Sequence, residues 1–170
     1  MKFLKLALLS FIVFSLLITA ISFFIPSKIR LSKVVEINCA DSLLMKEISN
    51  PENWKNWLPG IETAHYNYDN GKVNGYILNE SKQQFLLLKI VRTNEVVSKF
   101  ELGKKSIISG WKIIPVNKTN ATGIQWYMNF ELGWLPWEKF ISLFYENIYG
   151  TQMQNGLGKL KLLLETNSGN

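Results

Sequence analysis

The most informative segment of this chain is residues 122–144, which read "TGIQWYMNFELGWLPWEKFISLF". Its first half alternates apolar with polar side chains, and this period of two predicts a β-strand with one apolar face. The apolar set of that strand is Ile124, Trp126, Met128 and Phe130. Pro136 then suits the first position of a helix. The segment therefore predicts a strand that leads through a short turn into a helix.

The expected helix runs from Pro136 to about Glu165, and its apolar residues recur at helical spacing. The stripe consists of Trp137, Ile141, Phe144 and Ile148, and is resumed by Leu157, Leu160 and Leu164. The sequence around Tyr149-Gly150 predicts a kink or a change of register. We expect the stripe to face the sheet, with Gly156 and Gly158 allowing a close approach.

Upstream of residue 122 the chain predicts mostly strands joined by short connectors. The expected strands are 29–38, 61–68, 72–79, 84–92, 95–102, 107–116 and 122–132, with breaks that include Gly103-Lys104-Lys105 and 117–120. Asp69-Asn70-Gly71 is a strong hairpin signal. Such connectors favour neighbouring antiparallel strands, with one apolar and one polar face.

Two short helical turns are expected between the first and second strands. Asp41 or Ser42 can cap the first, and Asn50 with Pro51 can begin the second. The second carries Trp54 and Trp57, which lie three residues apart and so share a face. The two rings are expected to pin this turn to the sheet, with a ligand gate at Trp57 as the alternative.

This order of elements predicts an α+β fold in which a curved antiparallel sheet wraps around the C-terminal helix. A sheet and a helix of these lengths cannot close tightly along their whole contact. A cavity between them is the expected result.

The N-terminal segment 1–27 predicts a membrane anchor. Residues 6–25 carry no charge, and at about 1.5 Å per residue they span the roughly 30 Å of a bilayer core. A cleaved signal peptide and a buried helix are the alternatives. The flanking lysines and arginine nearly balance, and we favour a cytoplasmic N-terminus with the following domain outside.

Residues 28–166 have the length of one domain, and 167–170 are expected to be a frayed tail. The single cysteine, Cys39, excludes an internal disulfide and a cysteine-based zinc site. The net charge of +6 comes from scattered lysines, so nucleic-acid binding is not expected. The residues show no metal-ligand cluster or phosphate loop, and no cofactor is expected.

Three segments resemble the SRPBCC superfamily, which includes the START and birch-pollen-allergen proteins, and in particular its bacterial polyketide cyclase/dehydrase-like members. The first is 24–60, where Trp54, Trp57 and Pro59 occupy the positions of a W-x-x-W-x-P element. The others are 122–144 and 149–165, "YGTQMQNGLGKLKLLLE", which resembles the family's G-x-x-(hydrophobic)-x-x-G-L-x-x-L-K ending. The resemblance implies the helix-grip fold, and several such proteins carry an N-terminal membrane helix.

The expected binding site is the apolar space between sheet and helix. Its candidate residues are Trp57, Ser98, Phe100, Ser109, Trp111, Trp126, Met128, Phe130, Ile141 and Phe144, with Trp137 facing them. An apolar wall with a few hydroxyl groups is the usual composition of a small-molecule pocket. The sequence therefore favours a membrane-tethered module that binds a hydrophobic small molecule or lipid, the bilayer itself being contacted by residues 6–25.

Two other functions remain open at this point. A cyclase or dehydratase-like enzyme is suggested by the resemblance, and its only candidate acid/base groups are His65, Tyr66 and Tyr76. The lone His65 is more simply an exposed or structural residue. The third possibility is a structural or protein-interaction domain whose large rings fill the core.

Overall fold

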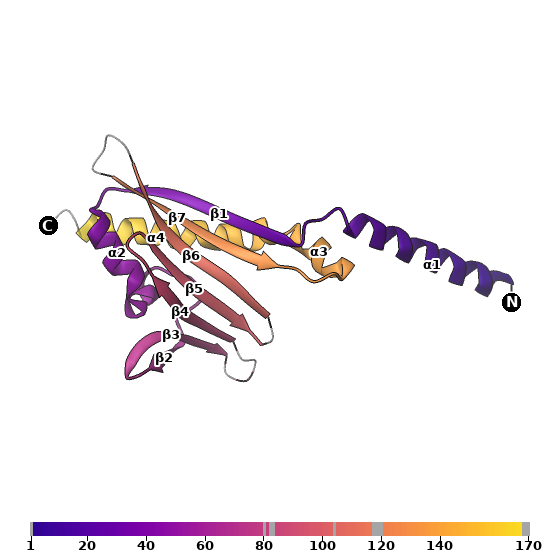
Figure 1. The fold of residues 1–170 in the computed structure, drawn as a ribbon, viewed down its shortest axis with the longest axis horizontal. Helices are drawn as coiled ribbons and strands as arrows, with labels where there is room; N and C mark the ends of the chain where they lie inside the picture. Colours follow the sequence, from indigo (N-terminus) through magenta and orange to yellow (C-terminus); the bar gives the residue numbers. More distant parts are fainter. Residues whose placement is uncertain (1, 80, 82–83, 104, 117–120, 168–170) are drawn as a thin grey trace.

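The computed structural model describes residues 2–79, 81, 84–103, 105–116 and 121–167 (Figure 1). Lys104, the expected connector 117–120 and residues 168–170 of the expected tail lie outside the described residues. The helices are α1 (Lys2–Ser22), α2 (Asp41–Ser49), α3 (Pro136–Ser142) and α4 (Thr151–Asn167), with a 3-10 helix η1 (Pro51–Asn56) and a π-helical segment η2 (Glu146–Gly150). The strands are β1 (Lys28–Ile37), β2 (His65–Asp69), β3 (Lys72–Asn79), β4 (Gln84–Val91), β5 (Glu95–Leu102), β6 (Lys105–Pro115) and β7 (Thr122–Glu131).

The strands form one seven-stranded sheet in the order β1-β7-β6-β5-β4-β3-β2. Every neighbouring pair is antiparallel. β1 is the edge strand beside β7, with Lys28 opposite Glu131 and Ile37 opposite Thr122. Helix α4 packs against β1 and runs along that part of the sheet (Figure 1). The predicted α+β helix-grip architecture is confirmed.

The apolar face predicted for the last strand forms the core side of the sheet. Ile124, Trp126, Met128 and Phe130 are all buried. The opposite face is less polar than expected at Tyr127, whose ring lies over Gly110 and under the guanidinium of Arg30 at 4.1 Å. A Cβ on Gly110 would lie 2.4 Å from that ring, so a glycine is needed there for Tyr127 to lie flat on the sheet.

The two short helices close one end of the sheet. Trp54 and Trp57 are fully buried, as the structural interpretation of this pair predicts. The Trp54 indole N–H donates to the Ile48 carbonyl at 2.8 Å, and its ring lies 5.2 Å from that of Trp111. The Tyr76 hydroxyl donates to the Pro51 carbonyl at 2.8 Å. These contacts fasten the end cap to the strands.

The helix caps agree with the sequence at one of two sites. Asn50 accepts a hydrogen bond from the Glu52 amide at 3.1 Å and so caps η1, as predicted. The prediction that Asp41 or Ser42 caps α2 is wrong, because α2 begins after Ala40 and has no side-chain cap. The Asp41 carboxylate instead lies 2.5 Å from the Thr122 hydroxyl, so it joins α2 to β7.

The C-terminal helix differs from the single helix that was expected. It is divided into α3, η2 and α4, with η2 ending at the Tyr149-Gly150 break that the sequence predicts. The second part of the apolar stripe is buried against the sheet. The first part was expected to be buried against the sheet but is exposed; it consists of Trp137, Ile141, Phe144 and Ile148. Gly158 also differs, because a Cβ there would meet no atom within 4 Å.

Helix α1 extends away from the domain (Figure 1). It is long and apolar enough to cross a bilayer, a property that signal sequences near an N-terminus share. Almost all of its apolar side chains are exposed. At the C-terminal end of α1 the polar Ser22 is buried, and α1 contacts α3.

Candidate functional site

A cavity of about 370 Å³ lies between the sheet and the C-terminal helix. The sheet supplies Phe100, Ser109, Trp111, Trp126 and Met128 to its wall. The helix supplies Tyr149, Gln152 and Met153, and the segment after η1 supplies Leu58, Pro59, Gly60 and Ile61. Leu78, Gln84 and Leu86 complete the lining from β3 and β4. The space is therefore mainly apolar, with a few neutral polar groups.

Five of the ten residues expected at the site line this cavity: Phe100, Ser109, Trp111, Trp126 and Met128. Two others lie just behind the wall. Trp57 is fully buried and packs edge-on against Trp111 and Trp126, at centroid distances of 5.4 and 6.4 Å. Ser98 is buried with its hydroxyl 3.4 Å from the Ser109 carbonyl.

The remaining three expected residues lie toward the other end of the sheet. Phe130 and Ile141 line a second cavity of about 310 Å³, which lies between α3 and the adjoining ends of β5, β6 and β7. Phe144 is exposed and lines neither cavity. The expected site is thus divided, because α3 does not lie over the middle of the sheet as a continuous helix would.

The polar groups of the first cavity are placed by their hydrogen bonds. The Trp126 indole N–H donates to the Ser109 hydroxyl oxygen at 2.8 Å. The Trp111 indole N–H is buried and has no hydrogen-bond partner among the described residues. Leaving such a donor unpaired costs about 1–3 kcal/mol.

Several lining residues were not identified from the sequence. Leu78, Leu86 and Met153 belong to apolar faces for which the sequence predicts burial in the core but not a place at a cavity. Leu58 to Ile61 follow the W-x-x-W-x-P element, and the Pro-Gly stop was the available signal that the chain turns there. Gly60 has a φ of +88°, a left-handed conformation that favours glycine. For Tyr149 the sequence indicates only a break in the helix.

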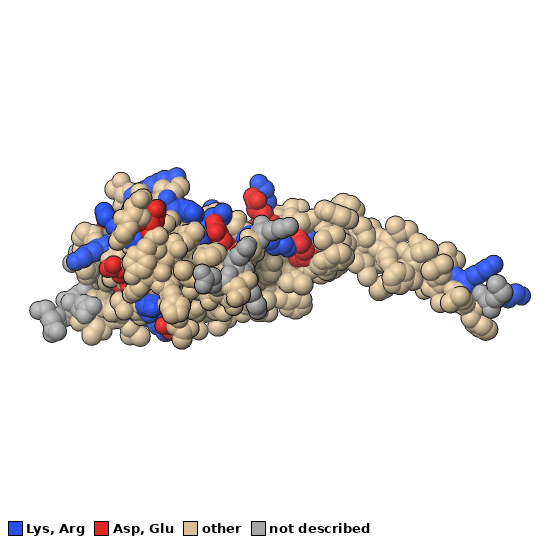
Figure 2. Space-filling view, turned by 90° about the horizontal axis from the view of Figure 1, so that it is seen from below, with Lys and Arg blue, Asp and Glu red and all other residues tan. Residues whose placement is uncertain are grey.

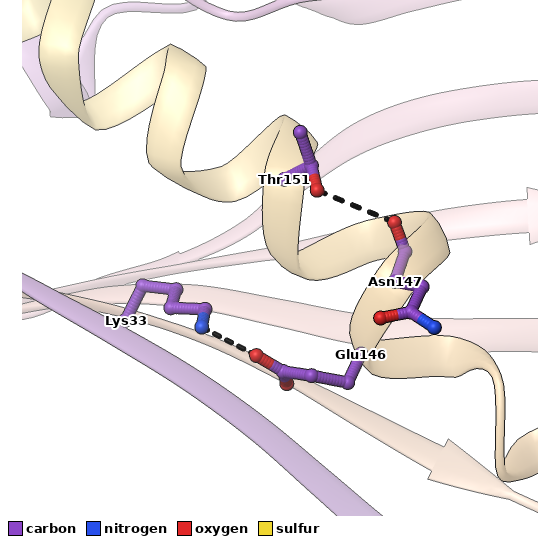
Figure 3. A network of polar contacts seen from close by, with 4 residues as sticks. All are labelled: Lys33, Glu146, Asn147 and Thr151. Carbon is purple, nitrogen blue, oxygen red and sulfur yellow. Dashed lines mark hydrogen bonds and ion pairs between the residues drawn. The ribbon is translucent and has the colours of Figure 1, made fainter.

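The π-helical segment η2 sets the position of Tyr149. Lys33 of β1 forms an ion pair with Glu146, and the Thr151 hydroxyl donates to the Asn147 carbonyl at 3.3 Å (Figure 3). A Cβ on Gly150 would lie 2.9 Å from the Glu146 carboxylate and 3.2 Å from Lys33 Cε. The absence of a side chain at Gly150 thus leaves room for this ion pair beside the helix.

Tyr149 lines both cavities. Its ring centroid lies 4.9 Å from that of Phe130 and 5.4 Å from that of Tyr145, and the Phe130 and Tyr145 rings are 4.7 Å apart. Burial, with Tyr145 nearby, raises the pKa of the Tyr149 hydroxyl above its ordinary value. The three rings form an aromatic cluster at the junction of the two cavities, and Tyr149 is neutral at neutral pH.

The candidate acid/base groups do not lie at the cavity. His65 is exposed, and Tyr66 packs against Tyr76 at 5.3 Å. Burial raises the pKa of Tyr76, whose hydroxyl is engaged with Pro51. The described lining of the first cavity includes no Asp, Glu, His, Lys or Arg. Within the described part of the chain, no group of three or more His, Cys, Asp or Glu residues is placed to hold a metal ion.

Comparison with known proteins gives a likeness in structure only. No family model matches the chain, and no curated protein matches its sequence. A START superfamily protein of Mycobacterium smegmatis superposes with a TM-score of 0.60 at 17% identity, covering 81% of this chain and 97% of that one. A protein of Nitrosospira multiformis gives a TM-score of 0.63 at 13% identity, with 84% and 100% covered.

A norcoclaurine synthase of Thalictrum, solved as a point mutant with a transition-state analogue, gives a TM-score of 0.60 at 11% identity, with 83% and 96% covered. At these identities the likeness concerns the fold and carries no activity with it. This chain has a seven-stranded antiparallel sheet, two short helices and a C-terminal helical segment. The chain therefore has the helix-grip fold of the START and SRPBCC proteins.

Proposed function

We propose that this protein is a membrane-tethered module that binds a hydrophobic small molecule or lipid in the cavity between the sheet and α4. The observation that carries the proposal is the cavity of about 370 Å³ with an apolar wall. Its volume falls within the roughly 300–1,000 Å³ of small-molecule sites. The large aromatic residues fill only part of the space under the sheet, which favours binding over the filled-core alternative.

The lining sets the chemistry of the ligand. Phe100, Met128 and Met153 offer apolar contacts to the body of the molecule. Ser109 offers a hydroxyl group, so we expect the ligand to carry a hydrogen-bonding atom at one end, such as a carbonyl or hydroxyl oxygen. Binding is driven by removing the apolar body from water, and the polar end fixes its orientation.

Helix α1 provides the tether. Its 21 residues, at about 1.5 Å each, match the thickness of a bilayer core. Residues 1–27 form the anchor and 28–166 the binding domain, which lies outside the cytoplasm. A ligand that partitions into membranes is then present at high local concentration beside the cavity. The cyclase-like alternative is not adopted, because its candidate groups lie away from this cavity.

Native mass spectrometry of the full chain extracted in mild detergent tests the binding function. We expect a co-purifying lipid or apolar metabolite at a fixed stoichiometry. Leu78→Trp replaces an aliphatic side chain of the cavity wall with a bulky indole ring and is expected to abolish the adduct. Leu162→Trp makes the same change on the exposed side of α4 and should retain it. Repeated absence of any adduct in folded wild-type protein would reject the proposal.

A further inference from the structure

The residues from Trp134 to Ile148 have an inverted polarity. The exposed fractions are 76% for Trp134, 60% for Trp137, 54% for Ile141, 61% for Phe144 and 47% for Ile148. These five residues are named here the α3 apolar face. The buried residues of the same helix are polar, namely Lys139 and Ser142. A helix in contact with water on its outer side would show the opposite arrangement.

The α3 apolar face adjoins the end of α1. The Lys139 ammonium donates to the Ile25 carbonyl at 2.9 Å, which ties α3 to the chain just after α1. α1 and α3 contact each other directly, and Phe23 and Phe24 at the same junction are exposed. Figure 1 shows α3 at the end of the domain from which α1 extends. The exposed apolar surface of α1 therefore continues onto α3.

The distribution of charged residues matches this continuous apolar surface. In Figure 2, Lys, Arg, Asp and Glu gather on the domain and at the far N-terminal end, and the length of α1 between them is free of charge. Within α3, the Glu138 carboxylate accepts hydrogen bonds from Lys105 of β6 at 2.5 Å and from the Gly133 amide at 2.7 Å. The Glu138 carboxylate is thus paired with groups of the domain.

We propose that the α3 apolar face lies in the interfacial layer of the bilayer that α1 crosses. This inference rests on the membrane tether proposed above. Two of the five residues are tryptophans, the residue type that is enriched where a membrane meets water. The face buries its apolar side chains among lipid headgroups and upper acyl chains, as an interfacial helix does. The domain is then held with its α3 end against the membrane.

The docking also decides where the second cavity opens. Trp137 and Ile141 belong to the α3 apolar face and line that cavity. Tyr149 connects its lining to that of the ligand cavity. With α3 in the interface, the second cavity lies next to the bilayer surface.

Spin labels on the full chain in vesicles of phosphatidylcholine and phosphatidylglycerol test this placement. Each label is attached to a single cysteine in a Cys39→Ala background. Phe144→Cys reports the α3 apolar face, and Leu162→Cys is the matched control, an exposed apolar residue of α4. Collision rates with oxygen, which concentrates in lipid, and with a water-soluble nickel chelate are compared. We expect oxygen to dominate at 144 and the nickel chelate to dominate at 162.

A third label, at Phe14→Cys in the middle of α1, separates the possible failures. Water exposure at 14 would show that α1 does not span the bilayer, and both the tether and this inference would fall. A lipid environment at 14 with water exposure at 144 would overturn this inference and leave the tether intact. Spin–spin broadening at 144 in place of oxygen contact would show that a second copy covers the face, which also overturns it.

Discussion

The two halves of the C-terminal helical segment share one sequence pattern and differ in what covers them. In α4, Met153, Leu157, Leu160 and Leu164 are at most 2% exposed and pack under the sheet. In residues 134–148 an equally apolar stripe is open, and the polar Lys139 and Ser142 are buried instead. Helical periodicity shows that an apolar face exists, and the neighbouring elements determine whether protein or another medium covers it.

The physical cause of the difference is the position of each half along the sheet. α4 lies beside β1, in the hollow that Trp126 and Ile124 line. The chain leaves β7 at its far end, so α3 begins beyond the hollow and meets the end of α1. There the Ile25 carbonyl accepts a hydrogen bond from Lys139, and the Ser142 hydroxyl donates to the Lys139 carbonyl at 2.6 Å.

The largest effect is expected from truncating the buried half. Leu160→Ala removes a fully buried side chain of α4, and the free energy of unfolding should fall by about 2–5 kcal/mol. Phe144→Ala removes a larger side chain from the open half, and in detergent it should change that free energy by at most about 0.5 kcal/mol. Urea unfolding followed by circular dichroism measures both. Equal losses would mean that the two halves are covered alike.

Two glycines of α4 allow the same comparison of a covered and an open position within one helix. A Cβ on Gly156 would lie 2.8 Å from the Trp126 ring and 2.9 Å from Pro59. Gly156→Ala should therefore destabilise the protein by about 1–3 kcal/mol. Gly158→Ala meets open space and should stabilise it by about 0.5–1 kcal/mol through higher helix propensity. Thermal unfolding distinguishes them, and a stabilising Gly156→Ala would show that α4 does not close on Trp126.

The contact between α3 and α1 gives a smaller, local effect. Lys139→Met removes the hydrogen bond to the Ile25 carbonyl, worth about 1 kcal/mol net, so the amides of α3 should exchange roughly fivefold faster. Lys159→Met in α4 removes a lysine that is 3.8 Å from Glu62 at the surface and should leave exchange unchanged. Hydrogen exchange with mass spectrometry reads both segments. Unchanged exchange in α3 would mean that Lys139 does not hold it.

The smallest effect concerns Tyr149, where the two halves meet. Burial raises the pKa of its hydroxyl in the folded protein, so above about pH 10 the unfolded chain ionises first. The free energy of unfolding should fall as pH rises from that point, and the fall should be shallower in Tyr149→Phe. Urea unfolding between pH 8 and about 11 measures the slope. Identical slopes would mean that Tyr149 is accessible to water.

The sequence alone determined the architecture of the domain. The period of two in β3, β5 and β7, the Asp69-Asn70-Gly71 turn and the long apolar C-terminal segment left few ways to bury their apolar faces. The W-x-x-W-x-P element likewise predicted the closed end, because two tryptophans this close need a common core. Half of the expected site residues line the main cavity for the same reason, since they occupy alternate positions on neighbouring strands.

Tertiary structure alone decided where the sheet's hollow ends. No local pattern shows that α3 lies beyond it. The sequence therefore predicts Ile141 and Phe144 in the ligand wall and does not predict Leu78, Leu86 or Tyr149 there. Nor does the sequence show that Trp111 has an unpaired N–H. Periodicity reports which side of an element is apolar, whereas the occupant of that side depends on contacts between residues far apart in the chain.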